Sequence, residues 1–243
     1  MEDKTVPEKK TPTPDKTTAA KHGDQGRRYR GVSEEVRRAE RRQRFIEAGL
    51  DVFGVRGYHS STVRSICASA GLTERYFYES FENSEDLLCG VYVFCIQRLR
   101  ERVLASLIGQ QDDIEAMAKQ ALRAFFESLR DDPRIARLLF IEVLGVSERV
   151  DTMYRITVED FANLLIRLSE PLVMGNLPAP LEAELVANGL LGSIIATASR
   201  WVLLGFNTPI DAMVINVHAI FVGVVRHLVQ ISEVAARTAS ASE

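Results

Sequence analysis

The stretch STVRSICASAGLTERYFYESF, Ser61 to Phe81, decides the fold of this chain. Thr62, like the serine before it, is a residue type that caps helix N-termini, and apolar residues follow at helical spacing. Gly71 then interrupts the helix, because glycine adopts a left-handed turn without steric cost. Thr73 can cap a second, short helix over residues 74–81. The stretch therefore predicts a helix-turn-helix motif.

The second helix of such a motif enters the DNA major groove with its N-terminal residues against the base edges. The residues expected at the base edges are Thr73, Glu74, Arg75 and Tyr76. The residues expected to position the DNA backbone are Thr62, Arg64 and Tyr78. Arg75 is expected to make a bidentate contact with guanine, because its planar guanidinium matches the O6 and N7 acceptors.

The motif and its flanks resemble the tetracycline-repressor (TetR) family of bacterial transcription regulators. The family pattern runs from an aromatic residue at the end of the first helix through a Gly-aromatic turn to the two motif helices and the start of a long helix. Its places are filled, in order, by Phe53, Gly57-Tyr58, Ser61-Thr62-Val63-Arg64, Ala70-Gly71-Leu72-Thr73, Tyr78, Phe81 and Leu87. Residues 34–88 carry the resemblance.

The resemblance implies an all-α homodimer with a three-helix DNA-binding head and a six-helix body for ligand binding and dimerisation. The expected divisions are an arm over residues 1–30, a head over 31–82, a body over 83–232 and a frayed tail over 233–243. The chain departs from the family pattern in two places. Glu79 and Ser80 stand where an aromatic and a His are frequent, and Ser84 stands where a Lys commonly contacts phosphate.

Charge is distributed unevenly along the 243 residues, whose net charge is −3. Residues 27–81 hold eleven Arg and no Lys against seven Asp and Glu, and the residues that follow are acidic. A basic head on an acidic body suits a protein that touches DNA at one end.

The arm contains almost no large apolar residue, so it cannot bury enough surface to order itself. Arg27, Arg28 and Arg30 at its end either reach DNA or only add solubility. The first helix is expected from Ser33 to Phe53, with one apolar face and one Arg-rich face. That Arg-rich face either contacts phosphate or is simply solvated.

Helix signals continue through the body, where residues near 84, 111, 133, 147, 181 and 209 begin six expected helices. The clearest start is Asp132-Pro133, a cap followed by proline at the first helical position. No run of alternating apolar and polar residues is long enough to predict a strand.

Enzyme and metal motifs are absent from the sequence: there is no HExxH, Walker loop, GxSxG or dinucleotide fingerprint. His218 and His227 lie too far apart for a helical metal pair, and the three Cys show no paired metal spacing. We expect no enzymatic activity, cofactor or metal. The polar N-terminus and odd Cys count favour the cytoplasm. Polar residues interrupt the most apolar stretches, 190–206 and 213–229, so we expect no membrane span.

Aromatic and Met side chains of the body are either ordinary core or the lining of a ligand pocket between helices. The candidates are Phe94, Phe125, Phe126, Met153, Tyr154 and Phe161. The expected effector is an apolar or amphipathic small molecule. The acidic body favours a neutral or cationic compound over a polyanion.

The last two helices are apolar around most of their circumference, more than one core-facing stripe requires. We expect them to form an intersubunit four-helix bundle, which places two heads on a pseudo-palindromic operator of double-stranded DNA. The alternative is the centre of a monomeric bundle.

Together these features predict a homodimeric repressor that an effector releases from its operator. Two other functions remain open. One is a DNA-binding regulator without a small-molecule effector, and the other is a helical ligand-binding or adaptor protein whose head no longer binds DNA.

Overall fold

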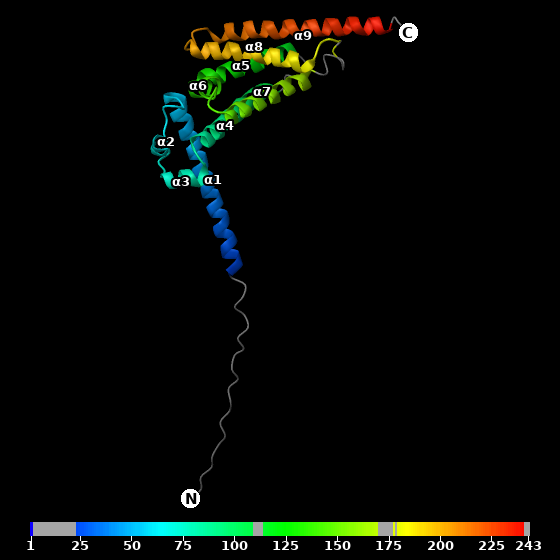
Figure 1. Ribbon diagram of the computed structural model, residues 1–243. Helices are drawn as coiled ribbons and strands as arrows, with labels where there is room; N and C mark the ends of the chain where they lie inside the picture. The colour runs from blue at the N-terminus through cyan, green and yellow to red at the C-terminus, as the bar shows by residue number, and fades with distance from the viewer. Residues whose placement is uncertain (2–22, 109–113, 170–176, 178, 241–243) are drawn as a thin grey trace. The chain divides into compact units, whose positions relative to one another are not determined.

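The computed structural model describes residue 1 and residues 23–108, 114–169, 177 and 179–240. Two compact units make up the chain, Met1–Glu40 and Arg41–Glu243. The described residues form nine α-helices and one π-helical segment, with no strand among them, which confirms the all-α fold. Figure 1 labels the helices along the chain.

Three helices, α1 (Gly23–Arg56), α2 (Val63–Ala70) and α3 (Glu74–Ser80), make the head. Six more follow: α4 (Ser84–Ser106), α5 (Ile114–Asp131), α6 (Pro133–Arg137), α7 (Glu148–Ser169), α8 (Ala183–Leu203) and α9 (Ile210–Ser240). The π-helical segment η1 (Leu138–Glu142) continues α6. The helix expected from Asp132-Pro133 therefore exists, but its second half is wound more widely than an α-helix.

Two helices extend beyond their expected ends. α1 begins at Gly23 rather than Ser33, so residues 23–30, expected in the arm, are helical. Ser33 lies inside the helix, where its Oγ accepts a hydrogen bond from Arg37 Nη2 at 3.3 Å. α9 continues to Ser240. The Ala-rich end of α9 favours helix, which explains its extension, whereas residues 23–32 contain three glycines and their composition does not explain the extension of α1. Residues 2–22 of the arm and 241–243 of the tail lie outside the described residues.

A cluster of three aromatic side chains holds α3 against α1. Phe45 of α1 and Phe77 of α3 are both fully buried, with ring centroids 5.5 Å apart and nearly perpendicular planes. Phe81, which follows α3, packs on both rings at 6.4 and 5.9 Å. The two contacts of Phe45 are edge-to-face, which adds a directional preference to the burial of a large apolar area.

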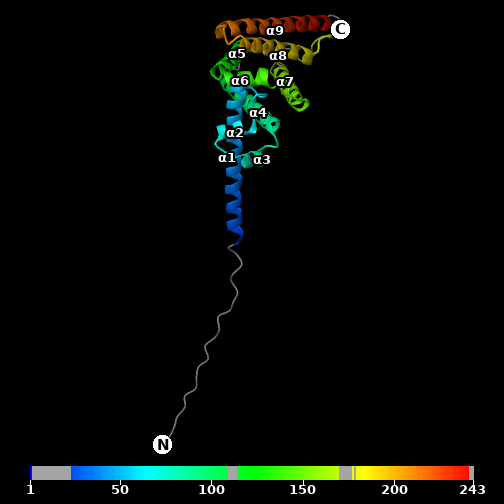
Figure 2. The same cartoon turned by 60° about the vertical axis from the view of Figure 1, so that its left-hand side comes forward.

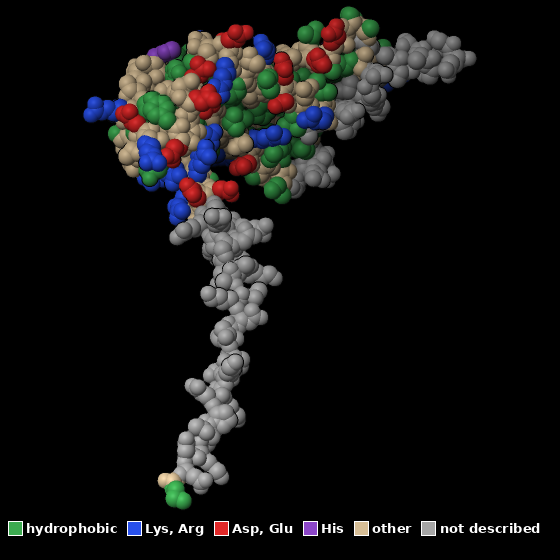
Figure 3. All heavy atoms as spheres, turned by 60° about the horizontal axis from the view of Figure 1, so that its bottom comes forward, with side chains coloured by type: hydrophobic (Ala, Val, Ile, Leu, Met, Phe, Trp, Pro, Cys, Tyr) green, Lys and Arg blue, Asp and Glu red, His purple; other side chains and the backbone are tan. Residues whose placement is uncertain are grey.

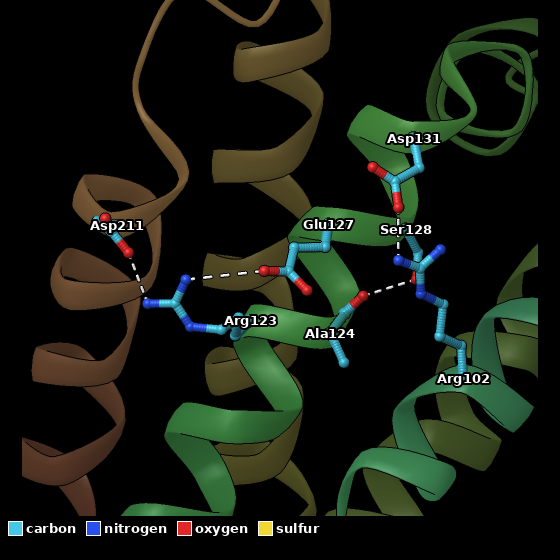
Figure 4. Close-up of polar contacts among 7 residues, drawn as sticks. All are labelled: Arg102, Arg123, Ala124, Glu127, Ser128, Asp131 and Asp211. Atoms are coloured by element: carbon cyan, nitrogen blue, oxygen red, sulfur yellow. Dashed lines mark hydrogen bonds and ion pairs between the residues drawn. The ribbon is translucent and has the colours of Figure 1, made fainter.

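The body is built around α5, which packs against α4 on one side and α9 on the other. Charged side chains reinforce both contacts (Figure 4). Arg123 of α5 pairs with Asp211 of α9 at 2.6 Å, and Arg102 of α4 pairs with Asp131 at 2.5 Å. These pairs are exposed, so they orient the helices more than they stabilise them.

A second link between α5 and α9 lies nearer the start of α5. Arg226 binds both carboxylate oxygens of Glu115 at 2.9 and 3.0 Å, and His218 Nε2 lies 2.8 Å from the Glu115 carbonyl oxygen. His218 and Arg226, two of the polar residues that interrupt the apolar sequence of α9, therefore bind α5 of the same chain.

Helices α8 and α9 lie side by side (Figures 1 and 2). Several of their large apolar side chains are exposed. By length and composition alone, α8 and residues 210–232 of α9 could each cross a membrane, yet only 17% and 28% of their most apolar windows are buried. The exposed large side chains on them include Leu185, Leu203, Ile215 and Ile220. Apolar surface of this extent on a folded chain indicates a binding partner.

Helix α6 crosses α1 at Gly54, where the two backbones approach closely. A Cβ at position 54 would lie 2.5 Å from Arg134 Cβ and 2.9 Å from Arg134 Cα. Neither atom can move without shifting the helix that carries it. Glycine is therefore required here by the close packing of head and body.

Gly54→Ala is expected to lower the free energy of unfolding by about 1–3 kcal/mol, because overpacking forces the two helices apart. Urea unfolding followed by circular dichroism measures the change. Val55→Ala at the neighbouring exposed position is the control and should change stability little. Equal stability of the Gly54→Ala and wild-type proteins would contradict the close contact.

Candidate nucleic-acid interface

The first helix of the helix-turn-helix, α2, has a specific cap at each end. Thr62 Oγ1 accepts from Ser65 N and Ser65 Oγ accepts from Thr62 N, both at 3.1 Å, so the start of α2 is a capping box. Gly71 ends α2 with φ of 62°, the left-handed conformation expected from the sequence. Leu72 N then donates to Cys67 O at 3.1 Å, which closes the turn.

Thr73 occupies the N-cap position of α3, as expected, but its side chain makes no capping hydrogen bond. α3 ends at Ser80, and Asn83 caps the following helix by accepting from Asp86 N at 2.9 Å. Both motif helices therefore lie where the sequence predicted them, with a different use of the second threonine.

The eight residues expected to contact DNA differ in exposure. The exposed ones are Thr62, Arg64, Thr73, Glu74, Arg75 and Tyr78. Tyr76 and Ser84 are half-buried. The ring of Tyr76 lies under the guanidinium of Arg41, whose Cζ is 4.6 Å from the ring centroid. A tyrosine covered in this way presents less of its face to a ligand than the exposed Tyr78 does.

Two arginines of α1 close the C-terminal ends of the motif helices. Arg44 Nη2 donates to the carbonyl of Ala70, the last residue of α2, at 2.7 Å. Arg42 Nη1 donates to the carbonyl of Ser80, the last residue of α3, at 2.8 Å, and its guanidinium lies 4.1 Å above the Phe81 ring. Positive charge at helix C-termini is favourable, so these arginines stabilise the motif itself. Only phosphate or solvent was expected as the partner of this arginine-rich face, because the carbonyl partners lie 26 and 38 residues away in the sequence.

Glu79 connects the recognition helix to α1 and to Arg75. Its carboxylate accepts from Arg75 Nε at 3.0 Å, one helical turn earlier, and its other oxygen lies 3.9 Å from Arg41 Nη2. The Arg75 side chain is 85% exposed and that of Glu79 is 37% exposed. Acidic side chains also stand among the Lys and Arg side chains over the face shown in Figure 3.

Glu142 of η1 holds the turn that follows α1. Its carboxylate accepts from Tyr58 N and from Arg137 Nε, both at 2.7 Å, and Arg137 Nη1 donates to the Val55 carbonyl at 3.2 Å. Arg137 and Glu142 are five residues apart, a spacing that does not share a face in an α-helix. The wider π-helical turn brings them together, which gives η1 a role in joining head to body.

Asp132 and Arg134 make a second joint beside it. Asp132 caps α6 and binds Arg134 through both carboxylate oxygens, at 2.8 and 2.7 Å, and Arg134 also pairs with Asp51 of α1. Partial burial raises the pKa of Asp132, but the hydrogen bonds and charge of Arg134 outweigh it and leave that pKa below its usual value. The charged form of Asp132 is therefore stabilised in the folded chain.

Six residues were expected to line an effector pocket, and the structure places them in different surroundings. Phe126 is fully buried against Trp201 at a centroid distance of 5.6 Å, whereas Phe125, Met153, Tyr154 and Phe161 are half-buried. Phe94 lines an open groove of about 340 Å³ between α1 and α4. A second groove, of about 500 Å³, lies between α8 and α9, with His227 among otherwise apolar or glycine residues. The other five candidates line neither groove.

Cysteine and metal chemistry have little basis in the described part of the chain. No group of three or more His, Cys, Asp and Glu there could hold a metal ion. Burial raises the pKa of Cys95 to about 12, so its thiolate is scarce at neutral pH. Cys67 is also buried, and burial again raises its pKa. Both behave as small apolar core residues.

A capped first helix, a left-handed glycine turn and a second helix with an exposed face define a helix-turn-helix motif. Residues 45–89 match the family described as bacterial regulatory proteins, tetR family. This match agrees with the resemblance seen in the sequence, so the helix-turn-helix of this chain is similar to that of tetR-family regulators.

Characterised relatives agree with this assignment. The chain is 25% identical over 165 residues to the fatty acid metabolism regulator protein of Bacillus subtilis, covering 65% of this chain and 81% of that protein. It is 26% identical over 174 residues to the HTH-type transcriptional activator FasR of Mycolicibacterium smegmatis, covering 72% and 77%. These relatives are transcription regulators, which confirms that the chain is a regulator and not an enzyme.

Solved structures share the fold. The fatty acid degradation regulator FadR from Bacillus halodurans superposes with a TM-score of 0.66 at 22% identity, over 75% of this chain and 95% of that one. The regulator FadR from Bacillus subtilis, solved in complex with stearoyl-CoA, gives a TM-score of 0.64 at 21% identity, over 73% and 95%.

Asp132→Asn is expected to lower the free energy of unfolding by roughly 1–3 kcal/mol at pH 7, since a hydrogen-bonded charge is lost while a good cap remains. Because the folded pKa is lowered, Asp132 stabilises fully above its unfolded pKa of about 4 and loses this effect as pH falls through the folded value. Urea unfolding from pH 7 to pH 3 measures the difference between variant and wild type.

The matched control is Asp131→Asn, which removes the adjacent, more exposed carboxylate and its pair with Arg102. Its effect should stay below about 1 kcal/mol, as for surface pairs in general. A difference for Asp132→Asn that is constant across the pH range would show that its charge contributes nothing.

Proposed function

We propose that this chain is a homodimeric repressor whose operator binding is released by a long-chain acyl-CoA thioester. The observation that carries the DNA-binding part is the exposed N-terminal half of α3, with Thr73, Glu74 and Arg75 on a helix fixed to α1 by buried aromatic rings. Because this packing holds α3 rigidly against α1, the short helix can present side chains to base edges in the major groove. The cell compartment that suits this function is the cytoplasm.

The acyl-CoA part rests on the relatives. A fatty acid metabolism regulator is among them, and a FadR of the same fold has been solved with stearoyl-CoA. Phe125, Ile141, Met153 and Tyr154 are half-buried apolar or aromatic residues that pack against the core, and side chains of this kind suit an acyl chain. Coenzyme A is polyanionic, so this ligand departs from the neutral or cationic compound that the acidic body favoured.

The coupling between ligand and DNA is proposed to run through the joints at Glu142 and Arg134. Both connect α6 and η1 of the body to the end of α1 and its following turn. A ligand releases DNA only if it binds the DNA-incompetent arrangement more tightly than the competent one. Movement of α6 and η1 would tilt the head through these contacts without unfolding it.

The dimer is proposed to form through α8 and α9. Gly189, Gly192 and Ala196 follow one another at helical spacing on the exposed face of α8. A Cβ at either glycine would meet nothing within 4 Å, and the same holds for Gly223 on α9. Open small residues surrounded by exposed apolar ones are suited to close approach of a second helix pair. The α8 and α9 helices of a second copy would cover this apolar face, so a membrane is not needed to cover it.

Specific DNA binding is tested by a gel-shift with the DNA upstream of the protein's own gene. Arg75→Ala should weaken operator binding by about 1–3 kcal/mol, roughly 5- to 150-fold, and relax the preference at one base per half-site. Tyr78→Phe should weaken binding to all sequences alike if its hydroxyl meets phosphate. Wild-type affinity in the Arg75→Ala protein would mean that the recognition helix is wrongly placed.

Effector binding is tested with stearoyl-CoA, using free coenzyme A and stearate as controls. Stearoyl-CoA should raise the midpoint of thermal unfolding through mass action and lower operator affinity in the same titration. Free coenzyme A should do neither. Stabilisation without loss of DNA affinity would exclude stearoyl-CoA as the inducer and favour a regulator without a small-molecule effector.

The dimer is tested by sedimentation at low micromolar concentration, where a species near twice 27.1 kDa is expected. Gly192→Arg should give the monomer, because it places a large charged side chain in the contact face while raising helix propensity. Gln120→Arg, an exposed position on α5, is the control and should remain dimeric. A wild-type monomer, or recovery of the protein with lipid vesicles, would overturn this interface.

A further inference from the structure

We infer that Glu79 is a positioning residue for base recognition, acting by holding Arg75 in the orientation that reads guanine. The inference rests on the proposed DNA-binding function and extends it to a residue that departs from the family pattern recognised in the sequence. It starts from the geometry of a carboxylate placed between two guanidinium groups on two helices.

The contact between Glu79 and Arg75 uses the nitrogen that base recognition does not need. Glu79 Oε1 accepts from Arg75 Nε at 3.0 Å. Within the described ranges, no hydrogen bond or ion pair engages the two terminal nitrogens of Arg75, and its side chain is 85% exposed. A bidentate contact to guanine O6 and N7 can use those terminal nitrogens. The carboxylate therefore holds the guanidinium of Arg75 at Nε and leaves the two terminal nitrogens available for a base.

Anchoring matters because an exposed arginine loses considerable side-chain entropy when it is fixed on a base. An ion pair on the surface contributes little to folding stability. It lowers the cost of binding if it holds the side chain near the bound orientation before DNA arrives. The ion pair then strengthens specific DNA binding and has little effect on the midpoint of thermal unfolding.

Glu79 is itself held from the other side. Its second oxygen lies 3.9 Å from Arg41 Nη2, and Arg41 stacks on Tyr76 at 4.6 Å. Arg41 belongs to α1, to which α3 is also fixed by Phe45 and Phe77. Glu79 therefore fixes the orientation of Arg75 relative to α1, because its carboxylate has partners on both α3 and α1.

Loss of the Glu79 charge and loss of its positioning contact have different effects on DNA affinity, which makes the inference testable. Removing the negative charge of Glu79 leaves Arg41 and Arg75 less neutralised and strengthens attraction to the phosphate backbone of any DNA. If Glu79 were only a solvated charge, its loss would raise affinity for operator and scrambled DNA by the same factor. If it positions Arg75, the ratio of the two affinities falls.

The experiment measures the dissociation constants of the full chain for operator and for scrambled DNA at one salt concentration. It compares wild type, Glu79→Gln, Arg75→Ala and the double variant. The matched control is Glu82→Gln, which removes an equal charge from an exposed position just after α3. Circular dichroism and thermal unfolding establish that each variant is folded.

Glu79→Gln is expected to lower the operator-to-scrambled ratio by about 5-fold or more, a sizeable part of what one bidentate contact supplies. Glu82→Gln should leave the ratio unchanged. In the Arg75→Ala background, Glu79→Gln should have no further effect on the ratio, since the two residues act as one unit. An unchanged ratio in Glu79→Gln, with wild type still specific, would overturn this inference alone. Wild-type protein with no preference for any DNA would overturn the proposed function as well.

Discussion

The contact of Phe45 with Phe77 is the interaction on which the rest of the head depends. Both side chains are fully buried, and their edge-to-face packing at 5.5 Å sets the distance and direction of α3 relative to α1. A seven-residue helix is too short to be stable by itself, so its geometry is supplied by this packing. Arg42 and Arg44 add hydrogen bonds to the last carbonyls of α3 and α2, and thereby fix the C-terminal end of each motif helix to one long helix.

The same helix carries the link to the body. Further along α1, the absence of a side chain at Gly54 allows α6 to pack closely. Glu142 accepts a hydrogen bond from the turn that follows α1. These polar contacts lie beside an apolar interior that is continuous from the head into the body. Hydrogen-bonded ion pairs have discrete arrangements and exchange partners without leaving a cavity, so a joint of this composition is suited to switching.

The sequence predicted features that local chemistry determines. Gly71 and Asp132-Pro133 fixed helix boundaries because a glycine turn and a capped proline start depend on neighbours along the chain. Features that depend on distant partners were not accessible. The roles of Arg42 and Arg44 require carbonyls 38 and 26 residues away. The π-helical turn at η1 brings Arg137 and Glu142 together, and no composition rule anticipates it. The helical residues before Ser33 were missed because low apolar content was taken as a sign of disorder.

Selection of bound DNA from a random pool by the purified full-length protein tests the central claim, that two exposed recognition helices on a dimer read a symmetric site. The account predicts enrichment of a pseudo-palindrome with two half-sites about one helical turn or a little more apart, and a guanine in each half-site that becomes less favoured when Arg75 is replaced by Ala. Absence of any enriched sequence, or enrichment of a single half-site bound by one chain, would contradict it.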